Sequence, residues 1–227
     1  GQQLQSLLGL GLLPLLAFLG GALTTTLVYL LGTREGGTSV TVMLLAGVAI
    51  TALSGAVIGL LTYLADDQML RNLSLWQMGS LAAGKPVDVG LALATLVALL
   101  WLFMRDANPL NALLLGEGEA RHLGVNVQCL KRRLILLTAA GVGVAVAVAG
   151  MIGFVGLVVP HLVRLLAGPN HVRLLPLSAL LGAALLLGAD MLARTLLAPA
   201  ELPVGIITAL LGAPFFIWLL VKSRRTL

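Results

Sequence analysis

Long uncharged stretches separate a few tight clusters of charge along this chain. Four of these stretches, residues 1–33, 36–65, 134–163 and 202–221, contain no Asp, Glu, Lys or Arg. An α-helix needs about 20 apolar residues to cross a hydrocarbon core about 30 Å thick, so each stretch is long enough to span a membrane. We therefore predict an all-α, polytopic membrane protein with seven membrane segments, at 10–31, 41–64, 88–104, 132–151, 157–167, 175–197 and 205–222.

Two segments depart from this simple pattern. Residues 67–79 are too polar to cross a membrane, but Leu70, Leu73 and Trp76 recur at helical spacing, which predicts a short amphipathic helix at the outer interface. Further along, glycines and Pro160 interrupt residues 150–160 and leave a helix of only about half a bilayer thickness. Broken helices at membrane depth are tolerated where they are buried in protein or line a cavity. This break is therefore either part of a transport path or a site of close helix packing.

The composition excludes a soluble protein and a nucleic-acid-binding one. Hydrophobic residues make up 59% of the chain and charged residues 10%. The basic residues are spread over separate loops and form no continuous stripe. Three of them fall on one predicted face (Arg71, Lys85, Arg194) and eleven fall in or beside loops on the other (Arg34, Arg105, Arg121, Lys131, Arg132, Arg133, Arg164, Arg173, Lys222, Arg224, Arg225). The positive-inside rule then predicts a cytoplasmic C-terminus.

Seven spans and a cytoplasmic C-terminus would place residue 1 outside the cytoplasm. The chain starts without Met and without a signal-like segment. We therefore expect residues 1–227 to form a single transmembrane domain that is N-terminally incomplete, with a cytoplasmic loop at about 105–131.

The sequence contains no pattern typical of a catalytic or metal site. His122, His161 and His171 are scattered, and Cys129 is the only cysteine, which excludes an internal disulfide and a multi-Cys metal site. A phosphate-binding G-x-x-x-x-G-K-[ST] loop is also missing. If a nucleotide drives this protein, the ATPase is another chain.

Two alternatives to a pump subunit remain open. Asp190 is the one acid well inside a predicted span and not at its edge, which favours a functional role such as proton or sodium coupling in a secondary transporter. Alternatively, Asp190 pairs structurally with Arg194, four residues later on the same helical face. An intramembrane hydrolase would need Ser54 near a histidine, and only His161 lies close to a membrane segment.

The 105–131 loop has an unusual apolar face for a segment outside the membrane. We expect two short helices here, broken at Gly116, with an apolar face that includes Leu113, Leu114, Leu115 and Leu123. Exposed apolar patches rimmed by charge usually mark a protein interface. The alternative is a loop that packs on its own helix ends.

Several ordered motifs resemble one transporter family along the whole chain. The segment Glu119-Ala-Arg-His-Leu-Gly124 resembles the EAA-type coupling loop of bacterial ABC importer permeases. The segments 149–161 (AGMIGFVGLVVPH), 189–194 (ADMLAR), 201–205 (ELPVG) and 211–215 (LGAPF) are similar to the FecCD family of iron-complex and vitamin B12 permeases.

The resemblance implies a homodimeric, multi-pass permease of the bacterial inner membrane, in contact with lipid. Family members have ten spans, of which this chain matches the fourth to the tenth. Two cytoplasmic ATPase subunits would bind ATP and Mg²⁺, a periplasmic binding protein would deliver the substrate, and this chain would bind no cofactor and no nucleic acid. The implied ATPase-coupling residues are Leu113, Leu114, Leu115, Glu117, Glu119, Ala120, Arg121, Leu123 and Gly124.

The resemblance also implies positions for the transport path. Arg194 would dock the binding protein, and the cytoplasmic gate would be formed by Thr38, Ser39, Val40 and Thr41, where Val40 replaces an expected polar residue. The path would be lined by one face of the following helix (Met43, Gly47, Ile50, Ser54). The substrate class is a bulky metal chelate: haem is favoured by likeness around Gly124 and residues 198–205, and a siderophore or cobalamin remains an alternative.

Overall fold

The computed structural model describes residues 16, 19–34, 37–82, 84–197 and 202–223. These residues form helices and one short antiparallel hairpin. A helix at Leu19–Gly32 leads to β1 (Thr33–Arg34) and β2 (Gly37–Thr38), in which Thr33 lies opposite Thr38. The helices that follow are α2 (Val40–Leu64), α3 (Asp67–Met78), α4 (Pro86–Arg105), α5 (Ala107–Leu113), α6 (Glu117–His122), α7 (Val127–Ala149), α8 (Val155–Ala167), α9 (His171–Thr195) and α10 (Val204–Ser223).

The seven predicted membrane segments are all present as apolar helices. In the described part of the chain, α2, α4, α7 and α9 are long and apolar enough to cross a membrane. Leu19–Gly32, α8 and Val204–Leu219 of α10 are shorter apolar helices. The N-terminal part of the first predicted segment, 10–31, lies mostly outside the described residues. The fold is therefore the predicted polytopic helical bundle.

Two helices begin four or five residues earlier than predicted, because asparagines cap them. The Asn126 side chain accepts a hydrogen bond from the Cys129 N–H and starts α7 at Val127. The Asn170 side chain accepts from the Val172 N–H and starts α9 at His171. A side-chain oxygen at this position satisfies a backbone donor that would otherwise be left unpaired at the helix start.

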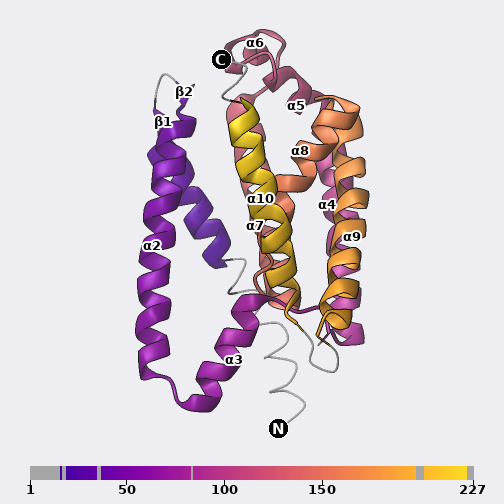
Figure 1. Ribbon diagram of the computed structural model, residues 1–227. Coiled ribbons are helices and arrows are strands. Elements are labelled where there is room, and N and C mark those ends of the chain that lie inside the picture. The colour runs from indigo at the N-terminus through magenta and orange to yellow at the C-terminus, as the bar shows by residue number, and fades with distance from the viewer. Residues whose placement is uncertain (1–15, 17–18, 35–36, 83, 198–201, 224–227) are drawn as a thin grey trace.

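The helices α4, α7, α8, α9 and α10 form the main bundle, while α2 and the helix before it stand to one side (Figure 1). Helix α9 joins the bundle together, because it packs against α4, α5, α8 and α10. Small residues allow this close packing: Ala189 and Ala193 of α9 are buried against Val204 and Ile207 of α10. Outside these contacts, many large apolar side chains are exposed, as expected for a surface that faces lipid.

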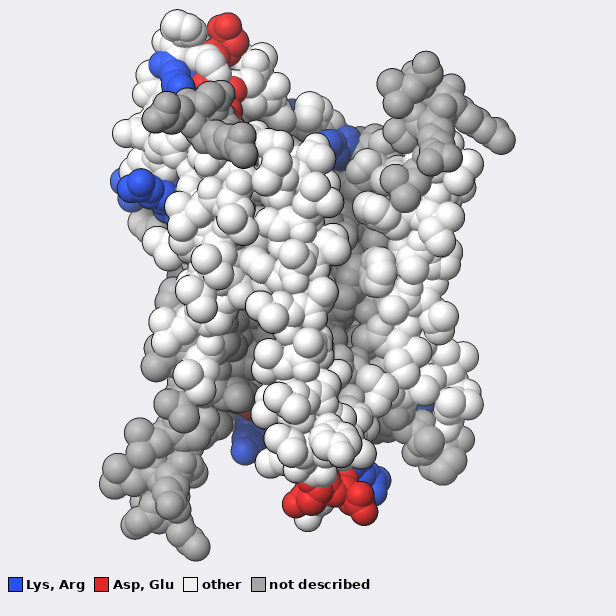
Figure 2. Space-filling model, turned by 90° about the vertical axis from the view of Figure 1, so that its left-hand side faces the viewer, with Lys and Arg blue, Asp and Glu red and all other residues white. Residues whose placement is uncertain are grey.

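Charge is concentrated at the two ends of the molecule. One end carries the β1–β2 hairpin, α5 and α6, and we call it the hairpin end; α3 lies at the opposite end (Figure 1). Figure 2 shows acidic and basic side chains at both ends of one face, with an uncharged band between them. This distribution matches a molecule whose middle lies in a bilayer.

The predicted break between α7 and α8 is also present. Helix α7 ends at Ala149, residues 150–154 are not helical, and α8 has only 13 residues. Phe154, just before α8, adopts a left-handed backbone with φ 67°, which is uncommon for a residue that carries a side chain. Pro160 lies within α8 and does not end it.

Candidate functional site

The helices α5 and α6 form a compact element outside the apolar spans, at the hairpin end. They are the two short helices predicted from the sequence, and Gly116 separates them with φ 106°, a conformation that favours glycine. The element is held to the bundle by an ion pair of 2.7 Å between Asp106 Oδ1 and Arg133 Nη1. Asp106 is buried, at 3% exposed, whereas the Arg133 side chain is 47% exposed, so only the carboxylate end of this pair is shielded from water.

A second attachment joins α5 to the start of α9. The His171 backbone N–H donates to Asn111 Oδ1 at 2.8 Å, and Asn111 Nδ2 donates to Asn170 Oδ1 at 3.0 Å. One amide side chain on α5 thus bonds to both the cap and the first residue of α9. These contacts fix the position of the α5–α6 element relative to the main bundle.

The outer surface of this element is apolar and uncovered in the described chain. Leu114, Leu115 and Leu123 are 49%, 66% and 63% exposed. The predicted alternative, in which the loop covers its own apolar face, therefore does not hold for these three leucines. Leu113 is half-buried; Glu119, Arg121 and Gly124 are exposed, and Ala120 is fully buried in the element.

Glu117, at the start of α6, belongs to a cluster that joins three elements. Lys131 Nζ on α7 donates to Glu117 Oε1 at 2.5 Å and also to Thr38 Oγ1 on β2. The hydrogen bond and charge of Lys131, together with Thr38, lower the pKa of the Glu117 carboxyl below its ordinary value of 4.5, against the opposing effect of partial burial. The Lys131 side chain is 16% exposed and the Glu117 side chain 29%.

The predicted gate residues lie where the hairpin becomes α2. Thr38 is in β2, Ser39 caps α2 by accepting from the Val42 N–H at 3.4 Å, and Val40 and Thr41 are the first residues of the helix. The predicted helix start, 41, is one residue later than the observed start at Val40. The structure thus brings the predicted gate and the predicted coupling residue Glu117 into contact through Lys131.

The predicted path residues lie along α2. Met43, Gly47 and Ile50 are half-buried, whereas Ser54 is exposed. Met43 faces Gly32 of the preceding helix: a Cβ on Gly32 would lie 2.1 Å from Met43 Cγ. Met43 and Gly47 also line an open hollow of about 560 Å³ on the α2 surface.

The geometry supports neither the secondary transporter, which would use Asp190, nor the intramembrane hydrolase, which would use Ser54. Asp190 Oδ2 accepts from Arg194 Nε at 2.8 Å, so the one intramembrane acid has a counter-ion on its own helix. Helix α2, which carries Ser54, stands apart from α8, which carries His161 (Figure 1). The His161 ring lies 6.4 Å from that of Phe215 on α10. No group of three or more possible metal ligands was found in the described parts of the chain.

At the end opposite the hairpin, α3, α7 and α10 meet through their backbones. The Ser80 N–H donates to Ala149 O at 2.8 Å. A Cβ on Gly150 would lie 2.3 Å from Trp76 O, and one on Gly205 would lie 2.1 Å from Met78 O, so only glycine fits at these two contacts. This junction holds α3 against the bundle although none of its residues Asp67–Met78 is buried.

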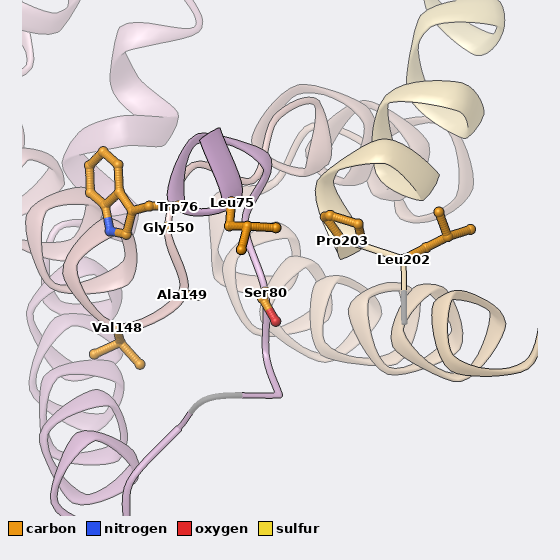
Figure 3. Close-up of a pocket in the computed structure, with 8 residues that line it drawn as sticks. All are labelled: Leu75, Trp76, Ser80, Val148, Ala149, Gly150, Leu202 and Pro203. Atoms are coloured by element: carbon orange, nitrogen blue, oxygen red, sulfur yellow. The ribbon is translucent and has the colours of Figure 1, made fainter. Parts of the chain in front are cut away.

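A cavity of about 360 Å³ lies beside this junction (Figure 3). Its wall is formed by the end of α3, the end of α7 and the segment before α10, with the residues Leu75, Trp76, Ser80, Val148, Ala149, Gly150, Leu202 and Pro203. The lining is mostly apolar, and no charged side chain contributes to it. It lies at the same end of the molecule as the Asp190–Arg194 pair.

Two residues that organise the hairpin end, Lys131 and Asn111, are not predicted as site residues by the sequence. Lys131 stands out there only as a member of a basic run that sets topology. The available signal for Lys131 is that it follows the cap residue Asn126 by five positions, which makes it part of a helix and not of a loop. Its partner Thr38 is 93 residues away, and a single sequence carries no sign of that pairing.

Comparison with known proteins agrees with this architecture. Over 209 residues the chain is 51% identical to the hemin transport system permease protein HmuU of Yersinia pestis, covering 92% of this chain and 62% of that protein. It is 46% identical to the vitamin B12 import system permease protein BtuC of Vibrio cholerae over 204 residues, covering 90% and 61%. The chain thus spans about three-fifths of the length of these two relatives.

A solved structure shares the fold. It shows an inward-facing conformation of a protein assigned to the metal-chelate type of ABC transporters, with a TM-score of 0.78 and 33% sequence identity. The match covers 94% of this chain and 74% of that one. The model of the FecCD transport family matches residues 3–222, nearly the whole chain. The chain therefore belongs to the FecCD transport family.

Proposed function

We propose that this chain is the membrane permease part of an ATP-driven importer that takes up a bulky metal chelate, with haem the favoured substrate. Family membership supports the transport role, and the relative with 51% identity is named for hemin transport. A vitamin B12 permease is 46% identical, so cobalamin is the main competing substrate, with a siderophore as a further candidate. The chain itself would carry out no catalysis.

The observation that carries this proposal is the α5–α6 element. It presents three exposed leucines beside Glu119 and Arg121 at one end of an apolar helical bundle, and it is anchored to that bundle by the Asp106–Arg133 pair. An exposed apolar patch rimmed by charge is typical of a protein interface. A separate ATPase docked here could move the element and, through its anchors, the spans behind it.

The other assignments follow from the same proposal. The hairpin end would face the cytoplasm, which places the C-terminus there as the positive-inside rule predicts. Two permease copies would assemble with two ATPase subunits that bind ATP and Mg²⁺. A periplasmic binding protein would dock at the opposite end, where Arg194 lies. The gate would be at 38–41, and the path along α2 would include Met43, Gly47, Ile50 and Ser54.

Two substitutions in the α5–α6 element test the proposal. In the permease expressed from its complete gene with the ATPase, Glu119→Arg and Leu123→Asp should each reduce recovery of the ATPase with the permease and reduce ATP-dependent uptake. Both side chains are exposed, so the fold should tolerate either change. Asp67→Arg, which places a matched charge change in α3 at the opposite end, is the control and should leave ATPase recovery unchanged. Normal recovery and uptake in both coupling variants would show that α5–α6 is not the docking site.

A further inference from the structure

The Lys131 ammonium group connects two elements that are far apart in the sequence. It donates to Glu117 on α6, 14 residues away, and to Thr38 on β2, 93 residues away. An ammonium group has three donors, so two of them are used to join α6 and the hairpin to α7. The contact is partly shielded from water, because the Lys131 side chain is only 16% exposed. Exposed ion pairs contribute little to stability. Breaking a shielded pair costs more free energy, because the remaining charge is left without its partner.

The hairpin side of this connection leads directly into α2. The Ser39 N–H donates to Gly32 O at 2.8 Å, and the Met43 N–H donates to Ser39 O at 3.1 Å. The end of the preceding helix, the hairpin and the first turn of α2 are therefore one hydrogen-bonded unit. A displacement of Thr38 would be carried to the start of α2, two residues further on.

A second contact joins the same two regions. The Tyr29 hydroxyl, on the helix before the hairpin, donates to Gln128 Oε1 on α7. Gln128 and Lys131 are three residues apart and so lie on the same face of α7. The first turns of α7 thus hold the hairpin unit at two points, and only the Lys131 contact also includes α6.

We propose that Lys131 is a positioning residue that transmits movement of α6 to the start of α2. The inference rests on the proposed function, in which an ATPase moves α5–α6 and α2 borders the path. When α6 moves, the Glu117 carboxylate pulls the ammonium group, and the ammonium group pulls the Thr38 hydroxyl. Without the ammonium group α6 could still bind the ATPase, but its displacement would reach α2 only through the direct contact between Thr38 and Glu117.

The experiment separates ATPase docking from coupling. The permease, expressed from its complete gene with its ATPase and binding protein, is reconstituted in lipid vesicles. ATPase recovery, ATP hydrolysis and substrate uptake are then measured for wild type, Lys131→Met and Thr38→Val. The control is Arg132→Met, which removes a positive charge from the adjacent, exposed position of the same helix. A paired exchange, Glu117→Lys with Lys131→Glu, restores opposite charges in reversed order, and Thr38 can then donate to the new carboxylate.

We expect Lys131→Met to recover the ATPase normally while uptake per ATP hydrolysed falls roughly fivefold, the lower end of ordinary coupling between sites. Thr38→Val should lower the same ratio, Arg132→Met should not, and the paired exchange should restore it to at least half of wild type. A merely structural role would lower recovery of the folded complex and not this ratio.

Two results would overturn the inference while leaving the proposed function intact. One is an uptake-to-hydrolysis ratio for Lys131→Met and Thr38→Val equal to that of Arg132→Met. The other is a paired exchange that folds and binds the ATPase but stays as uncoupled as Lys131→Met. If wild type itself recovers no ATPase, the proposed function fails, and the inference fails with it.

Discussion

Replacement of Gly150 by alanine should detach α3 from the bundle. Gly150 follows α7 directly, and the position where a Cβ would stand is 2.3 Å from the carbonyl oxygen of Trp76 on α3. Ordinary contact begins at 3.4 Å, so one of the two backbones would have to move by about 1 Å. The obstacle is a backbone carbonyl held at a helix end, and a simple change of side-chain rotamer cannot relieve it.

The expected cost has two parts. Gly150 has φ 71° and ψ −165°, a conformation that essentially only glycine adopts, and an alanine held there costs about 1–3 kcal/mol. Excess volume in a packed site usually costs about 1–3 kcal/mol. The two effects together predict a loss of about 2–6 kcal/mol in the free energy of unfolding. The hydrogen bond from the Met151 N–H to Trp76 O, already long at 3.3 Å, should weaken as well.

The measurement is the unfolding of the purified permease in mild detergent, followed by circular dichroism, together with amide hydrogen exchange. Gly150→Ala should lower the free energy of unfolding and speed exchange within α3, and exchange in α5 and α6 should stay as in wild type. Gly153→Ala is the matched control: it lies in the same break, no heavy atom lies within 4 Å of its Cβ position, and its φ is not left-handed. Equal stability and equal α3 exchange in the two variants would refute the argument.

Two further predictions concern charged groups at opposite ends of the molecule. Arg194→Glu should weaken the affinity for the binding protein and make the residual binding less sensitive to salt, because a charge at the rim of an interface mainly steers association and is screened by ions. Recovery of the ATPase should stay near wild type. An unchanged affinity, measured by surface plasmon resonance, would exclude Arg194 from docking. Because the pKa of Glu117 is lowered in the folded state, the stability contributed by its pairing is present above its ordinary pKa of 4.5 and is lost as the pH falls through the lowered value. The stability difference between wild type and Glu117→Gln should therefore be constant from about pH 5.5 to about pH 8 and should shrink only below about pH 4.5; a difference that already shrinks near pH 6 would contradict this assignment.

The spans could be predicted because their signal is local. Uncharged stretches such as 36–65 leave few alternatives to a membrane helix, and the glycines around residue 150 indicated the break after α7. Helix starts were less accurate at α7 and α9. Asn126 and Asn170 are ordinary cap residues, but each stands outside the apolar pattern on which the ranges were based. Phe154 is harder still, because its sequence gives no sign of a left-handed backbone.

The site could be predicted in part for the same reason. The α5–α6 element follows from local glycines and a run of leucines, whereas the gate at 38–41 and the path along α2 were implied by the family resemblance and stay predictions. The Lys131 contact depends on how distant segments are brought together at the hairpin end, as does the packing of Gly205 against Met78. Neither partner shows a distinctive pattern of its own, so only the three-dimensional arrangement reveals these contacts.

The backbone junction of α3, α7 and α10 has a consequence for how the protein is made. During synthesis α3 leaves the ribosome long before Gly150 and Gly205, the two glycines that later receive its carbonyl groups. Helix α3 is amphipathic and buries no residue of its own, so it stays at the membrane surface until α7 and then α10 have been inserted. Helix α10, which is synthesised after α3 and α7, thus completes the contact site of α3, and a ribosome that stalls before Gly205 would leave α3 without this contact.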